Sequence, residues 1–83
     1  MKNENHNIDY CLDITDDVCP MTFVKTRLHI EKMTAGELLV IRLKGAEPLQ
    51  NVPDSVRELG HSVLSEAEER SGSGIWRIVV RKN

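Results

Sequence analysis

The sequence predicts a two-layer α/β (α+β) sandwich whose elements follow in the order β-α-β-α-β-β. Residues 8–14 alternate apolar and polar side chains, which is the period of a strand with one buried face. Residues 20–34 repeat apolar side chains at helical spacing, and residues 38–44 return to a strand pattern. Because crossovers between parallel strands are right-handed, both helices are expected on one face of the sheet.

The length and charge fit one small domain. We expect residues 8–83 to form this domain and the polar residues 1–7 to be a flexible start. A formal net charge of −2 argues against direct nucleic-acid binding. No apolar run approaches the ~20 residues of a membrane span, and MKNENHN lacks the apolar centre of a secretory signal. A cytoplasmic location with two free cysteine thiols is therefore expected.

The first strand and the first helix follow from these patterns. Tyr10, Leu12 and Ile14 are expected to face the core, which points Cys11 away from it. The helix stripe expected to be buried consists of Phe23, Thr26, Ile30 and Met33. The stripe on the opposite side consists of Met21, Val24 and Leu28, and His29 is expected to be exposed. Gly36 is expected to end this helix in a left-handed conformation.

The second half of the chain supplies another helix and three strands. Residues 45–50 are expected to form a loop, after which Asn51 caps a short helix with Pro53 in its first turn. Val52, Val56 and Leu59 are predicted to lie on one side of that helix, which Gly60 ends. The final strands begin near residue 61 and at residue 75, with Trp76, Ile78 and Val80 inward.

Cys19-Pro20 is the candidate reactive motif. Proline favours the first position of a helix, which would place Cys19 at the N-cap or next to it. Unpaired N–H groups and the positive end of the helix dipole lower a cysteine pKa there, and the thiolate is the nucleophilic form. Nearby charges act in both directions. The carboxylates of Asp16 and Asp17 would disfavour a Cys19 thiolate, whereas Lys25 and Arg27 would favour it. A free cysteine also commonly serves only as a small buried apolar residue.

Several short motifs together resemble the TusA-like (SirA-like) family of small sulfur-carrier proteins. They run from about Tyr10 to Lys82 in the order Leu12-Asp13, Cys19-Pro20, Arg27, Gly36-Glu37, Val52-Pro53, Gly60-His61 and Arg81-Lys82. The resemblance implies a four-stranded mixed sheet under two helices. It also implies that Cys19 carries sulfur as a persulfide, received from a cysteine desulfurase or a rhodanese and passed to an acceptor protein. The family's uses of this sulfur include tRNA thiolation, molybdenum cofactor biosynthesis and sulfur oxidation.

Two departures from the family signature bear on its activity. Thr22 replaces the second proline, so that the signature is Cys-Pro-Met-Thr, and its hydroxyl is placed to contact the cysteine or to cap the helix. Asp16-Asp17 replaces a glycine and an apolar residue. These changes suggest a divergent subgroup and leave open an adaptor that has lost sulfur transfer. A third class is a thiol redox or selenium-handling protein, which a Cys11–Cys19 disulfide would favour.

The outer surfaces of the predicted fold supply candidate partner sites. The second helix stripe, Met21, Val24 and Leu28, together with Lys25 and Arg27, is predicted to dock donor and acceptor proteins. The alternatives are that rotation of the helix buries much of this stripe or that it forms a dimer contact. The outward arginines Arg42, Arg77 and Arg81 are interpreted as a solvated surface, with an acidic partner or RNA as the alternative. We expect no metal site, no cofactor and a monomer, since the two cysteines lack the spacing of a zinc motif.

Overall fold

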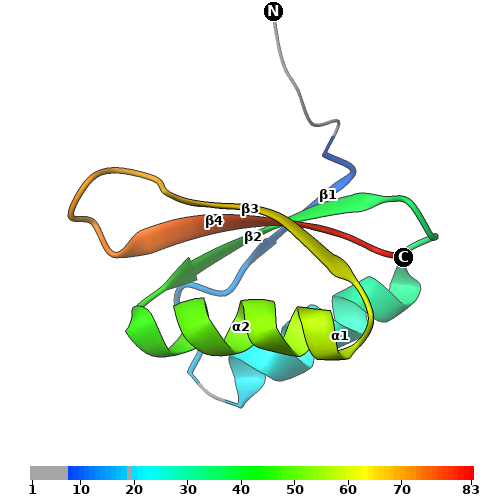
Figure 1. The fold of residues 1–83 in the computed structure, drawn as a ribbon. Helices are drawn as coiled ribbons and strands as arrows, with labels where there is room; N and C mark the ends of the chain where they lie inside the picture. Colours follow the sequence, from blue (N-terminus) through cyan, green and yellow to red (C-terminus); the bar gives the residue numbers. More distant parts are fainter. Residues whose placement is uncertain (1–7, 19) are drawn as a thin grey trace, which may run out of the picture.

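The chain folds into a sheet with two helices packed against one of its faces (Figure 1). The structure is a computed structural model that describes residues 8–18 and 20–83. Within these residues the elements are β1 (Tyr10–Asp13), α1 (Met21–Lys32), β2 (Leu38–Lys44), α2 (Ala46–Glu58), β3 (Ser62–Glu68) and β4 (Ile75–Arg81). The predicted order β-α-β-α-β-β is confirmed. Neither described helix is long and apolar enough to cross a membrane.

The described strands form one mixed sheet in the order β1-β2-β4-β3. β1 and β2 are parallel, and β4 lies antiparallel to both β2 and β3. Two β-α-β crossings of the same hand leave α1 and α2 below the sheet and its upper face without a helix (Figure 1). We call this upper side the open face. The two-layer sandwich predicted from the sequence is therefore confirmed.

The core lies between the sheet and the helices and is almost entirely aliphatic. Its buried members are Ile14, Ile30, Met33, Leu39, Ile41, Leu43, Val52, Val56, Ile78 and Val80. Alternation along β2 and β4 directs every second side chain into this core, as the sequence predicts. Trp76 is partly buried and packs against the same cluster. On the open face, Val40 and Val79 are paired across β2 and β4 and are also buried.

The prediction for the second helix is wrong at its start. Residues 45–50 are not a loop, because α2 begins at Ala46 after Gly45, whose φ of +102° only glycine adopts readily. Pro48 occupies the third helical position, where a backbone N–H has no partner within the helix. Pro53 consequently lies inside the helix and is buried. Leu59, predicted to lie on the same side of the helix as Val52 and Val56, is exposed just beyond the last turn.

The first helix also differs from its prediction. It begins at Met21 and ends at Lys32, so that Pro20 is the N-cap residue and Gly36, with φ +92°, lies in the turn beyond the helix. Thr22 is buried where Phe23 was expected to be, and Phe23 is only partly buried. His29 is partly buried rather than exposed, because its ring meets Tyr10 edge-on with centroids 5.2 Å apart. The side of the helix that is buried against the sheet is therefore the one with residues 22, 26, 30 and 33.

Candidate functional site

The candidate site lies where β1 ends and α1 begins. Cys19, the predicted sulfur carrier, lies outside the described residues, so the site is built from the residues on either side of it. On one side the chain leaves β1 at Asp13 and runs through residues 14–18, which we call the cysteine loop. On the other side it enters α1 through Pro20. The carboxyl end of a strand and the amino end of a helix therefore flank the cysteine.

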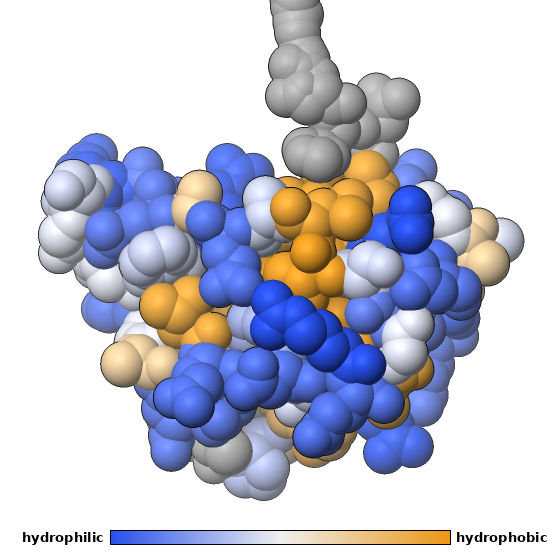
Figure 2. All heavy atoms as spheres, viewed as in Figure 1, coloured by the Kyte–Doolittle hydropathy of each residue, from blue (hydrophilic) through white to orange (hydrophobic). Residues whose placement is uncertain are grey.

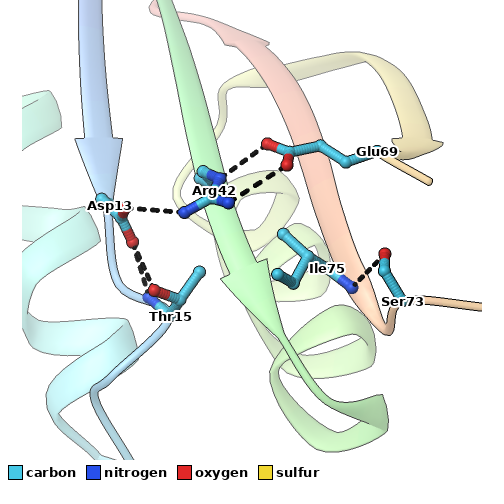
Figure 3. Close-up of polar contacts among 6 residues, drawn as sticks. All are labelled: Asp13, Thr15, Arg42, Glu69, Ser73 and Ile75. Atoms are coloured by element: carbon cyan, nitrogen blue, oxygen red, sulfur yellow. Dashed lines mark hydrogen bonds and ion pairs between the residues drawn. The ribbon is translucent and has the colours of Figure 1, made fainter.

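Asp13 joins the cysteine loop to the sheet. Its carboxylate accepts hydrogen bonds from the Thr15 backbone N–H at 2.9 Å and from the Thr15 hydroxyl at 2.7 Å. Its second oxygen accepts a hydrogen bond from Arg42 Nη1 at 3.0 Å. Arg42 also donates two bonds to Glu69, at 2.6 and 3.1 Å, which Figure 3 shows on the opposite side of the guanidinium. Three segments far apart in the sequence are tied together by these four residues.

The hydrogen bonds shift the titration of the three ionised groups. The pKa of Asp13 is lowered mainly by the Thr15 backbone N–H and hydroxyl, with Arg42 adding to the effect. The pKa of Glu69 is lowered mainly by its hydrogen bonds to Arg42. The pKa of Arg42 is raised by the same two carboxylates, Glu69 first. All three groups are therefore charged in the folded protein at neutral pH.

Replacing Asp13 with asparagine is expected to flatten the loss of stability in acid. The lowered pKa of Asp13 stabilises the folded protein above its unfolded pKa of about 3.9, and this stabilisation is lost as pH falls through the folded value. Asp13→Asn should thus lower the free energy of unfolding at pH 7 and show a shallower decline below about pH 4. Urea unfolding across this pH range measures both effects.

Asp54→Asn is the matched control, because Asp54 pairs at 3.3 Å with Arg57 on the exposed side of α2. Its decline in acid should follow that of the wild type. An Asp13→Asn curve parallel to the wild type would contradict the role of Asp13.

Ile14 anchors the beginning of the cysteine loop in the core. Its side chain is only 1% exposed, and its N–H donates to the backbone oxygen of Arg42 at 2.8 Å. Its own carbonyl accepts the N–H of Asp17 at 3.1 Å, which closes a turn. The loop therefore starts from a fixed point beside β2.

The charges around the cysteine loop are mostly compensated. Lys25 binds both carboxylate oxygens of Asp17, at 2.8 and 3.0 Å, and Arg27 pairs with Glu31 at 3.1 Å. The sequence places acidic and basic residues here with opposite effects on a thiolate, and the structure pairs one of each sign. Among these groups, Asp16 makes no ion pair within the described part of the chain. Asp16 is thus an exposed carboxylate of the cysteine loop that lacks an ion-pair partner among the described residues.

Two alternatives were predicted for the Thr22 hydroxyl, and one of them, a contact with Cys19, lies outside the described residues. Thr22 lies in the first turn of α1, is 3% exposed, and its carbonyl accepts the Thr26 hydroxyl at 2.8 Å. Within the described residues no side chain caps the start of α1, so the prediction that Thr22 caps it is wrong. The second helical position needs no N–H partner, and a threonine replaces a proline there without loss of a helical hydrogen bond.

Exposed apolar side chains lie on the two segments that flank Cys19, the cysteine loop and α1. Met21 and Leu28 are 43% and 52% exposed, and Val24 is half-buried, as expected for the second helix stripe. Val18 is 74% exposed and extends this surface into the cysteine loop. Val18 was not among the residues predicted for this surface, although an isolated apolar residue in a polar loop beside a candidate nucleophile is a usable signal in the sequence. We call these four residues the apolar rim.

Cys11 and the side chains that could bind a metal do not form a second site in the described residues. Cys11 is exposed on the open face, beside Val40 of β2. In residues 8–18 and 20–83, no three histidine, cysteine, aspartate or glutamate side chains are grouped so as to hold a metal ion.

Residues 10–82 match the sequence model of the family described as "Sulfurtransferase TusA". The chain belongs to the TusA family. Its TusA-family relatives include a protein of Archaeoglobus fulgidus, 41% identical over 86% of this chain and 78% of the relative. Another, from Thermotoga maritima, is 32% identical over 92% of this chain and 94% of its own. Both are named "Putative sulfur carrier protein".

Solved structures of similar proteins share the fold. A SirA-like protein from Desulfitobacterium hafniense superimposes with a TM-score of 0.73, covering 87% of this chain and 95% of that one, at 16% identity. A Helicobacter pylori protein gives a TM-score of 0.71 over 88% and 96% of the two chains, at 21% identity. The fold implied by the sequence motifs of the TusA family is therefore confirmed.

Proposed function

We propose that this TusA-family protein is a sulfur carrier that accepts a sulfane sulfur on Cys19 and passes it to an acceptor protein. The similarity to proteins named as sulfur carriers over most of the chain is the observation that supports this most strongly. The sulfur donor is a protein with a persulfide, such as a cysteine desulfurase or a rhodanese. The acceptor is a protein with a cysteine thiol.

The proposed transfer is a pair of balanced thiol exchanges. The Cys19 thiolate attacks the outer sulfur of the donor persulfide, so that one S–S bond forms while the donor S–S bond breaks. The donor cysteine leaves as a thiolate, and no oxidant or cofactor is consumed. The acceptor thiolate then attacks the outer sulfur on Cys19 in the same way and restores the Cys19 thiolate.

The surroundings of the cysteine loop support this chemistry. Asp13 and Ile14 hold the beginning of the loop, and the Asp17–Lys25 pair holds it against α1. The first turn of α1 contains no acidic residue that would compete for the positive end of the helix dipole. The departures at Thr22 and Asp17 are therefore compatible with a reactive thiolate, because one is buried and the other is ion-paired.

Loading of Cys19 by a donor tests the proposal. The wild-type protein is incubated with a cysteine desulfurase and cysteine, without reductant, and its intact mass is measured. We expect the gain of one sulfur atom, mapped to the peptide containing Cys19 and removed by reductant. Folded protein that gains no sulfur from several donors would contradict the proposal and favour an adaptor without sulfur transfer.

Replacing Leu28 with glutamate is expected to slow loading without unfolding the protein. The apolar rim is the proposed docking surface for the donor, and a charge on it would be desolvated against the partner. A loss of about 1.4 kcal/mol in the free energy of binding the donor corresponds to about tenfold slower transfer at limiting donor concentration. The rate of mass gain at limiting donor concentration measures it.

Leu64→Glu is the control for Leu28→Glu, because Leu64 is 40% exposed on the distant edge strand β3. It should load at the wild-type rate. Equal loading of both variants would show that the apolar rim does not bind the donor.

A further inference from the structure

The open face gathers cationic side chains that the proposed sulfur transfer does not use. Alternation along β2 and β4 places Arg42, Lys44, Arg77 and Arg81 on this face. Of its acidic residues, Asp13 and Glu69 are both bound to Arg42, and Asp9 accepts the backbone N–H of Leu38 at 2.9 Å. In the described part of the chain, the other three cations have no carboxylate within 4.0 Å. The face thus has unpaired positive charge although the whole chain has a net charge of −2.

A depression of about 450 Å³ lies on this face beside the turn between β3 and β4. It is lined by Arg42, Glu69, Arg70, Ser73, Ile75 and Arg77. Figure 2 shows that hydrophilic residues cover the turn itself, which Figure 1 places at the left end of the sheet. Ile75 adds an apolar wall, which suits the methylene groups of an acidic side chain.

The walls of this depression are fixed, and two of its guanidinium groups remain available. Glu69 holds Arg42 by two hydrogen bonds, and Ser73 Oγ accepts the N–H of Ile75 at 3.2 Å (Figure 3). Arg70 and Arg77 are exposed and form no ion pair with any described residue. A guanidinium group binds a carboxylate through two parallel hydrogen bonds, so this pair is suited to neighbouring carboxylates.

The chemistry of the face favours an acidic protein segment over single-stranded RNA. RNA binding of this kind relies on aromatic rings on which bases stack. Tyr10 and Trp76, whose rings are the nearest candidates in β1 and β4, lie on the helix side of the sheet, against His29 and the core. The open face offers arginines and the valine pair Val40 and Val79 instead.

We propose that the depression lined by Arg70 and Arg77 is a docking site for a carboxylate-rich segment of a partner protein. Asp13, Arg42 and Arg77 are aligned across the sheet at the end from which the cysteine loop leaves. A partner bound there lies on the same end of the molecule as that loop. The binding itself requires no sulfur chemistry, so its test is independent of the proposed function.

Binding of a capped hexaglutamate peptide to the full chain tests the site. Amide NMR shifts of the ¹⁵N-labelled protein are followed at about 50 mM and about 300 mM salt, where screening differs strongly. We expect shifts centred on residues 69–77 and weaker binding at high salt. Arg70→Glu with Arg77→Glu should weaken binding at least about tenfold, or about 1.4 kcal/mol.

Matched variants separate this site from general charge attraction. Arg57→Ala, on α2 and already paired with Asp54 and Glu66, should bind like the wild type. If the double glutamate variant does not fold, Arg70→Gln with Arg77→Gln replaces it. Shifts scattered over the surface, or binding unchanged in the double variant, would overturn the proposal. Tighter binding of oligouridylate than of hexaglutamate through the same arginines would also overturn it.

Discussion

Replacing Cys19 with serine is expected to abolish sulfur loading completely. A serine hydroxyl is not ionised at neutral pH and does not attack a persulfide sulfur, whereas a thiolate does. The intact mass after incubation with donor and cysteine should therefore stay that of the unmodified chain. The thermal midpoint should stay close to the wild-type value, because the substitution changes one atom.

The second cysteine separates the functional classes. Cys11→Ser should load like the wild type, because Cys11 is exposed on the open face and belongs to β1 rather than to the cysteine loop. Loss of function in both variants would point to a dithiol couple. Loading that persists in Cys19→Ser would place the sulfur elsewhere and refute the carrier proposed here.

Replacing Ile14 with alanine is expected to destabilise the protein strongly. The side chain is 1% exposed in the core, and its removal should cost about 2–5 kcal/mol. Total stabilities of small domains are about 5–15 kcal/mol, so this is a large fraction. The thermal midpoint should fall by roughly 8–40 °C, at about 4–8 °C for each kcal/mol. Calorimetry or circular dichroism measures the change.

The position of Ile14 also connects stability to the site. Its backbone N–H is bonded to β2, so the alanine variant should keep this bond while losing its side-chain anchor. At a temperature where the variant remains folded, loading of Cys19 should be slower than in the wild type. Ile8→Ala is the control, because Ile8 is 39% exposed and should change the free energy of unfolding by less than about 0.5 kcal/mol. Equal destabilisation by both variants would contradict the anchoring role.

The sequence predicts the sheet and its inward faces well because strand periodicity is local. Leu39, Ile41 and Leu43 alternate with outward residues, and one buried face fixes which set points inward. The start of α2 could not be predicted equally well, since Pro48 is typical of a loop and of a first helical turn. The tertiary structure selects the helix, because the helical conformation packs Leu49 against the core.

The candidate site, like the fold, could be predicted from the sequence only in part. The short motifs from Leu12-Asp13 to Arg81-Lys82 were together sufficient to predict the TusA family, which is confirmed over residues 10–82. Asp13 was expected to matter only as part of a motif. Its bonds to Thr15 are local, whereas its bond to Arg42 requires β1 and β2 to be neighbours. The bonds from Arg42 to Glu69 in turn require the end of β3 to lie near β2. The sequence does not contain these distances.

The sequence by itself determined the order of the elements, the aliphatic core and the candidate nucleophile, because each depends on residue type and short-range spacing. Only the tertiary structure decided which charges meet. It paired Asp17 with Lys25 and enclosed Arg42 between Asp13 and Glu69, which left Arg70 and Arg77 without such partners among the described residues. Ion pairs form between side chains that folding brings within a few ångströms, and that proximity depends on sheet order and strand register rather than on position along the chain.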